Sequence, residues 1–97
     1  MLQLEECKNK LSDFKQAFGA KFGITNIGIF GSVARRENTP ESDIDIVVEI
    51  EKPSLSTMYE LKETLKNLFG CEVDLVRFRD SLRPLLKTNI QNDAVYV

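Results

Sequence analysis

Short runs rich in β-branched residues alternate along this chain with longer segments that have the apolar spacing of a helix. We expect three strands, at residues 24–30, 43–50 and 71–78. We expect helices from Leu4 to Gly19 or Gly23, over residues 33–37, from Leu55 to Gly70, and from Leu82 to Ile90. Residues 94–97 could add a short strand or a docking segment. This alternation predicts a small α/β sheet with helical crossovers.

The spacing of apolar residues also predicts which faces form the core. In the strand at 43–50 one face should be buried, with Ile44, Ile46, Val48 and Ile50. The opposite face should open towards solvent or a cleft, with Asp43, Asp45, Val47 and Glu49. The helices should bury the residues that recur every three or four positions: Leu4, Cys7, Leu11, Phe14, Phe18, Leu55, Met58, Leu61, Leu65, Leu68, Leu82, Leu85, Leu86 and Ile90.

Three aspartates lie in or beside strand-like runs. Asp43 and Asp45 are two residues apart, so their side chains should point to the same face and could share a hard divalent cation. Asp74 lies between Val73 and Leu75, and an acid buried there must be hydrogen-bonded, paired or metal-bound. Two simpler interpretations remain open: Asp43 could be a turn residue, and the acids could pair with one of four arginines, Arg35, Arg36, Arg77 and Arg79.

The Gly31–Ser32 pair follows an apolar run and precedes a predicted helix. Glycine allows close approach of the backbone, and helix N-terminal amides attract anions. Ser32 could add its hydroxyl to a phosphate oxygen, or it could simply cap the helix, a role worth about 1 kcal/mol. A phosphate cradle, two paired acids and a third acid together suggest metal-assisted transfer from a nucleoside triphosphate. In such a site Asp45 could bridge two ions, and Asp74 could take the proton from the attacking hydroxyl.

Composition excludes several other functions. The chain has 97 residues, which suits one domain spanning 1–97, and its net charge of −2 gives no basic surface for long nucleic acids. It has no histidine, which excludes Ser-His-Asp and Cys-His catalysis within this chain. We expect Cys7 and Cys71 to be buried free thiols. With neither a signal peptide nor an apolar run of membrane length, we expect a cytoplasmic protein without membrane contact.

The joint motif resembles the signature of the polymerase-beta-like nucleotidyltransferase superfamily. Gly31-Ser32, then Asp43-x-Asp45 after ten residues, then Asp74, match that signature. The fuller strings Gly-Ser-Val-Ala-Arg-Arg-Glu and Ser-Asp-Ile-Asp-Ile-Val-Val resemble its minimal branch, the MNT-domain proteins, from about Ile24 to Ile90. Members commonly carry glycine where Arg36 stands, a departure expected to alter only the rim of the nucleotide site.

The resemblance implies a mixed sheet flanked by helices and Mg²⁺-dependent transfer of a nucleoside monophosphate. It implies Asp43, Asp45 and Asp74 as catalytic and metal-binding residues for two Mg²⁺ ions. We expect Gly31, Ser32 and Arg35 to bind the nucleotide, with ATP as substrate. Minimal members are usually encoded beside a HEPN-domain ribonuclease toxin and act as its antitoxin, some by transferring AMP to a tyrosine of the toxin.

Three functions are therefore compared. The leading one is a type VII-like antitoxin that adenylylates a HEPN partner and could form an oligomer through it. The second is an antitoxin that neutralises the partner by binding alone. The third is a small-molecule nucleotidyltransferase that needs a second chain, since 97 residues leave no room for an extra substrate domain.

Overall fold

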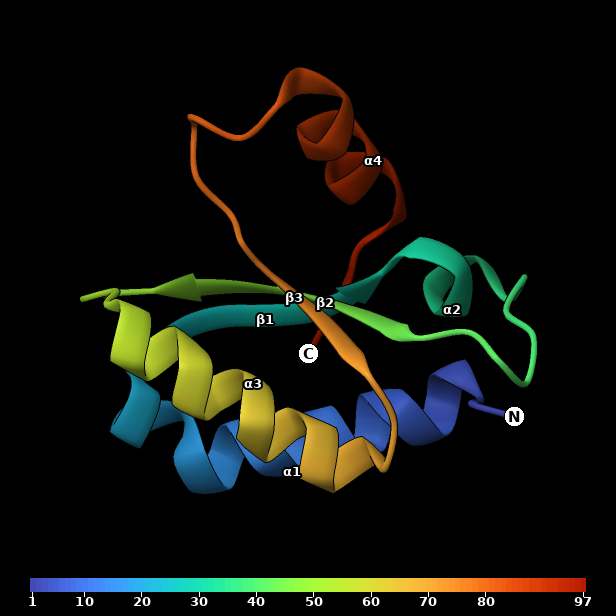
Figure 1. The fold of residues 1–97 in the computed structure, drawn as a ribbon, viewed down its shortest axis with the longest axis horizontal. Coiled ribbons are helices and arrows are strands. Elements are labelled where there is room, and N and C mark those ends of the chain that lie inside the picture. The colour runs from blue at the N-terminus through green and yellow to red at the C-terminus, as the bar shows by residue number, and fades with distance from the viewer.

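A mixed four-stranded sheet with helices on both faces forms the protein (Figure 1). The computed structural model describes residues 1–97. Its elements, in chain order, are α1 (Leu4–Phe22), β1 (Ile24–Phe30), α2 (Gly31–Arg35), β2 (Ile44–Ile50), α3 (Leu55–Phe69), β3 (Val73–Arg77), α4 (Pro84–Asp93) and β4 (Val95–Tyr96). The expected α/β class, with a small mixed sheet and flanking helices, is confirmed.

The strand order is β3-β2-β1-β4. β2 and β3 are parallel and are joined by the α3 crossover, whereas β1 runs antiparallel to both β2 and β4. β3 is an edge strand, and its residue Asp74 lies opposite Asp45 of β2. Phe30, the last residue of β1, lies opposite Asp45 from the other side. The topology therefore brings the Gly31 turn and two aspartates together where β1 ends and where β2 and β3 begin.

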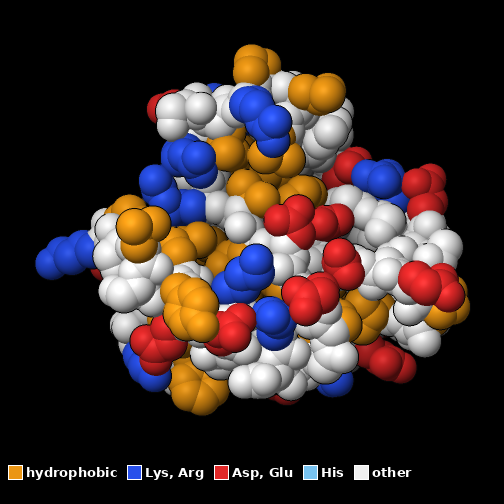
Figure 2. Space-filling model, in the orientation of Figure 1, with side chains coloured by type: hydrophobic (Ala, Val, Ile, Leu, Met, Phe, Trp, Pro, Cys, Tyr) orange, Lys and Arg blue, Asp and Glu red, His pale blue; other side chains and the backbone are white.

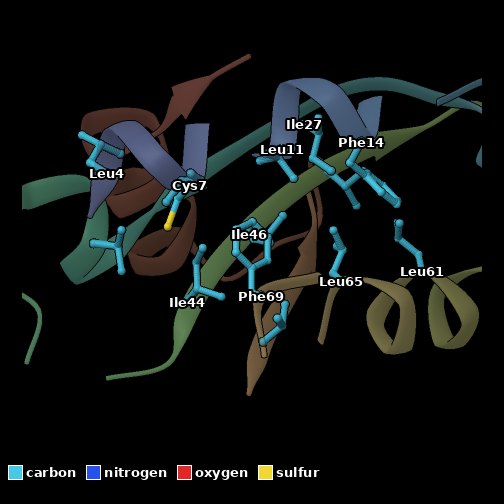
Figure 3. Close-up of a cluster of buried hydrophobic side chains, with 14 of the residues drawn as sticks. Leu4, Cys7, Leu11, Phe14, Ile27, Ile44, Ile46, Leu61, Leu65 and Phe69 are labelled. Carbon is cyan, nitrogen blue, oxygen red and sulfur yellow. The ribbon is translucent and has the colours of Figure 1, made fainter. Parts of the chain in front are cut away.

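Two apolar clusters hold the helices to the sheet. The larger packs α1 and α3 on one face of β1 and β2, and its fully buried members include Leu11, Ile27 and Ile46 (Figure 3). The smaller consists of Phe30, Val47, Leu82 and Ile90, and it joins α4 to the opposite face. Burial on both sides stabilises the central strands, because each apolar side chain removed from water contributes about 1.5–3 kcal/mol.

Four assignments of the apolar faces are wrong. Val47 is fully buried rather than open to a cleft, because Leu82 and α4 cover that part of the second face. Leu55, Leu85 and Phe18 are 92%, 74% and 42% exposed. Each lies on a face of its helix that no other element covers. The apolar spacing predicted the helices correctly, but it could not show which of their apolar residues are left exposed.

The ends of α1 and α3 agree with the glycines that predicted them, whereas the predicted bounds of α2 and β3 are less accurate. Gly23 and Gly70 adopt left-handed conformations, with φ of 69° and 67°, and end α1 and α3. α2 begins at Gly31, two residues before the predicted start, and β3 is three residues shorter than expected. Within residues 94–97, Val95–Tyr96 form the short strand β4, which pairs with β1.

The cysteines are free thiols, as expected. Cys7 is buried in the larger cluster, but Cys71 is only half-buried because it lies in the turn that precedes β3. Burial raises the pKa of both thiols, and their proximity raises that of Cys7 further. None of the four helices is long and apolar enough to cross a membrane.

Candidate active site

Asp45 is the centre of the candidate site. It lies near the start of β2, half-buried, with Asp74 of the adjacent parallel strand directly beside it. Burial, the charges of Asp74 and Asp43, and a side-chain hydrogen bond with Asp74 raise the pKa of Asp45 from 3.8 to about 6. Asp74 and Asp43 are exposed. The structure thus crowds Asp45 with two other carboxylates, and Arg35 offsets that charge only in part.

Gly31 packs against the Asp45 carboxylate. Its φ is +72°, which an L side chain rarely adopts, and a Cβ there would overlap Asp45 Oδ2 and lie 2.9 Å from Asp45 Cγ. Both the backbone conformation and the available space therefore require glycine. The close approach places the start of α2 beside Asp45.

Ser32 does not cap α2, so the structural interpretation of this residue is wrong. The N-cap position belongs to Phe30, which makes no side-chain hydrogen bond, and Ser32 is the second residue of the helix. Its side chain is half-buried beside the Gly31 turn. The hydroxyl is therefore not committed to the helix end and can contact a ligand.

The acids do not pair with arginines, so that simpler interpretation is also wrong. Arg35 binds Glu37 at 2.9 Å and Asp93 of α4 at 2.7 Å, and Arg36 binds Glu5 at 3.1 Å. No ion pair of the protein includes Asp43, Asp45 or Asp74. Asp43 lies in the loop directly before β2, which begins at Ile44 and not at Asp43 as predicted, so the turn interpretation of Asp43 stays open.

Arg35 takes part in two ion pairs in this structure, and its contact with the nucleotide stays a prediction. Its guanidinium joins α2 to α4 through Asp93, whose side chain is 18% exposed, and it lies near enough to lower the pKa of Asp45 slightly. Sequence reasoning missed Asp93, since nothing in its helical surroundings distinguishes it from a solvated acid. Arg36 has a φ of 60°, the one positive value outside glycine, so a glycine would carry less backbone strain at this position.

The donor set fits a hard divalent cation such as Mg²⁺. The candidate ligands are carboxylates alone, without the nitrogen or sulfur ligands that softer metals prefer. No group of three or more acidic, cysteine or histidine side chains is placed to hold an ion unaided. Mg²⁺ usually takes one or two carboxylates and completes its shell with water and substrate phosphates. The Asp45–Asp74 pair therefore suits an ion that arrives with a nucleotide.

Comparison with known proteins agrees with this geometry. The family model described as "Nucleotidyltransferase domain" matches residues 11–97. The protein adenylyltransferase MntA of Thermococcus cleftensis is 41% identical over 98 residues, which cover 100% of this chain and 98% of that protein. A solved structure provisionally named as a minimal nucleotidyltransferase is 30% identical and has a TM-score of 0.79. The match covers 97% of this chain and 95% of that chain.

Two toxin–antitoxin complexes show the same fold at lower identity. One contains AMP-PNP; it is 24% identical, covers 92% of this chain and 70% of that chain, and has a TM-score of 0.75. The other is a tri-AMPylated Shewanella oneidensis HEPN toxin with an MNT antitoxin. It is 21% identical, covers 90% of this chain and 70% of that chain, and has a TM-score of 0.62. At these identities the likeness concerns the fold.

Proposed function

This chain belongs to the nucleotidyltransferase domain family, and from that membership we propose that it transfers AMP from ATP to a partner protein. The chain is an enzyme of the nucleotidyltransferase class. The observation that best supports the proposal is the Asp45–Asp74 pair: Asp45 packs against Gly31, and neither aspartate forms an ion pair with an arginine. Crowded carboxylates at an open sheet edge are costly unless a cation or phosphate chemistry uses them.

In the proposed reaction, the acceptor hydroxyl attacks the α-phosphorus of ATP. A bond forms between the hydroxyl oxygen and that phosphorus, the bond to the bridging oxygen of the β-phosphate breaks, and pyrophosphate leaves. Asp74, exposed on the edge strand, takes the hydroxyl proton. The Gly31 and Ser32 amides and the Ser32 hydroxyl hold the leaving phosphates, where close backbone approach is possible.

The proposal assigns two Mg²⁺ ions to the three aspartates. Asp43 and Asp45 would hold one ion, and Asp45 together with Asp74 would hold the other. When bound, such ions neutralise charge on the phosphate oxygens and so lower the barrier to displacement. The protein's own contribution is to fix the carboxylates, because adjacent parallel strands hold Asp45 and Asp74 in register.

We propose a HEPN-domain toxin as the partner and one of its tyrosines as the acceptor. The relative from Thermococcus cleftensis is named a protein adenylyltransferase, and similarly folded chains occur in toxin–antitoxin complexes, one with an AMPylated HEPN toxin. Docking of a partner makes the attack effectively intramolecular, which can contribute about 7–11 kcal/mol to lowering the barrier. The chain would then act as an antitoxin by modifying its partner.

The proposal is tested by following which phosphate of ATP reaches the partner. Purified chain, Mg²⁺ and the HEPN-domain protein are incubated with ATP labelled at either the α- or the γ-phosphate. We expect the α-label on the partner and the γ-label in released pyrophosphate. A γ-label on the partner would indicate phosphoryl transfer and overturn the proposal. Asp45→Asn is the control, since it keeps the size of the side chain but removes its charge.

One observation favours an antitoxin that acts by binding alone. No three acidic side chains converge closely enough to hold an ion without a substrate. This alternative predicts that Asp45→Asn still neutralises the toxin in cells. The enzymatic proposal predicts that the same variant binds the toxin but leaves it active.

A further inference from the structure

A groove lies between α4 and the β3 side of the sheet. Its main hollow is about 480 Å³, within the roughly 300–1,000 Å³ typical of binding pockets. The floor is apolar, formed by Val76, Leu82 and Leu86, and the walls carry Arg77, Arg79 and Arg83. Two smaller hollows continue it, one past Leu85 and one past Leu55. Figure 2 shows hydrophobic side chains in the hollow below α4, with Lys and Arg side chains beside them.

The three arginines of this groove have no acidic partners. None of them takes part in any ion pair, and the one hydrogen bond among them runs from Arg79 Nη1 to the Arg77 carbonyl oxygen at 2.8 Å. No acidic residue lines the main hollow. The nearby acid of the loop, Asp80, instead faces Lys87 at 3.5 Å. A chain of net charge −2 thus presents a locally basic groove with an apolar floor.

The groove is on the side from which an acceptor would approach. The Gly31 turn lies at the end of β1, Asp45 on the next strand, and Asp74 on the edge strand beyond it. In an in-line displacement the attacking and leaving oxygens lie on opposite sides of the phosphorus. If the leaving phosphates lie over Gly31, the acceptor comes from the β3 side. Val76 is two residues beyond Asp74, about 7 Å along the same face.

We infer that this groove docks an extended, acidic and apolar segment of the acceptor protein and guides its hydroxyl to Asp74. The inference rests on the proposed function for the identity of the partner. Acidic side chains of the segment would pair with Arg79 and Arg83, and an apolar or aromatic side chain would fill the hollow over Val76 and Leu82. Leu55 and Leu85, 92% and 74% exposed, extend the apolar contact at the two ends.

The decisive variant is the double charge reversal Arg79→Glu/Arg83→Glu. Both side chains are exposed, and Arg83 is the N-cap of α4, where an acid favours the helix. The fold should therefore survive, and a melting curve checks this. Arg79→Lys/Arg83→Lys retains the charge. Lys10→Glu, a single exposed charge reversal on α1 across the sheet, is the control for a charge changed elsewhere.

The measurement is the Kd for the HEPN-domain protein at low and moderate salt, together with the rise in Tm that Mg-ATP produces. We expect the double reversal to raise Kd by at least about tenfold and to flatten its salt dependence. The lysine pair and Lys10→Glu should change Kd by less than about threefold. The rise in Tm with Mg-ATP should be the same in all four proteins, because the groove is assigned to the acceptor.

Two results would overturn the inference. One is a Kd that the double reversal leaves unchanged or that Lys10→Glu raises equally. The other is loss of the Mg-ATP effect with unchanged Kd, which would assign the groove to the nucleotide. Failure of the proposed function is recognised separately: wild-type protein and Asp45→Asn would both bind the partner, and neither would transfer AMP. In that case the docking result still stands on Kd alone.

Discussion

The raised pKa of Asp45 comes from the residues that bury it and from the carboxylates beside it. Burial and two nearby carboxylates raise its pKa to about 6, and no cation of the protein compensates fully. Above that pH, in the absence of metal, the folded protein holds a charge that the unfolded chain would hold at less cost. The candidate site is thus a local source of instability that a cation would relieve.

Asp45→Asn should abolish AMP transfer and stabilise the metal-free protein in a pH-dependent way. Because the pKa of Asp45 is raised from 3.8 to about 6, the folded wild type binds more protons than the unfolded chain between those values. Its stability on this account is highest below about pH 4 and falls as pH rises to about 6. The Tm of the variant minus that of the wild type, measured in chelator, should therefore increase from pH 4 to 7. A difference that is flat with pH would contradict this explanation.

Gly31→Ala should cost more than its matched control, Gly70→Ala. Both glycines have positive φ, +72° and +67°, so each substitution carries about 1 kcal/mol of backbone strain. A Cβ at Gly70 meets nothing within 4 Å, whereas one at Gly31 overlaps the Asp45 carboxylate. We expect a similar, modest loss of Tm from the shared strain, a larger total loss in Gly31→Ala, and loss of AMP transfer in that variant alone. Equal losses would show that the close packing on Asp45 is unimportant.

At the scale of elements, the strands and helix stops were largely predictable and the coverage of the sheet was not. Ile24–Phe30 was predicted to the residue because glycine and β-branched residues mark a short strand clearly. Val47 was misassigned because alternation shows two faces of a strand but cannot reveal that α4 buries part of the second. The juxtaposition of Gly31 with Asp45 depends on strand order, which no local pattern encodes.

The attachment of α4 can be measured with one buried and one exposed position. Ile90 is fully buried in the smaller apolar cluster, while Leu85 is 74% exposed on the same helix. Ile90→Ala should lower the free energy of unfolding by about 2–5 kcal/mol, and Leu85→Ala by less than about 0.5 kcal/mol. Chemical denaturation of the two variants gives both values. A small loss in Ile90→Ala would mean that α4 is held mainly by the Arg35–Asp93 pair.

At the scale of the whole molecule, one face of the sheet carries the residues that the proposed reaction uses. Asp45, Asp74 and Val76 lie on the same face of β2 and β3, so the aspartate pair and the basic groove open on the same face of the sheet. This arrangement leaves the chain without a wall for the acceptor side of the site, since β3 is an edge strand. A bound partner would supply that wall.

Mg-ATP should stabilise the isolated chain more than Mg²⁺ does. Ligand at about 100 times its Kd adds roughly 2.7 kcal/mol to stability. Mg²⁺ without nucleotide should stabilise the chain less, because no group of three ligands is already in place to bind it. Thermal melting with Mg²⁺, with ATP and chelator, and with both distinguishes these effects. An unchanged Tm in millimolar Mg-ATP would argue against a nucleotide site at Asp45.

The most direct test of the central claim is the intact mass of the HEPN-domain partner after incubation with this chain, Mg²⁺ and ATP. The account predicts that the partner gains mass in whole AMP units with the wild type. It predicts none with Asp45→Asn, although that variant still binds the partner. Fragmentation of the product should place AMP on a tyrosine. A partner that stays unmodified yet is fully inhibited, or one that Asp45→Asn modifies as well as the wild type does, would contradict the account.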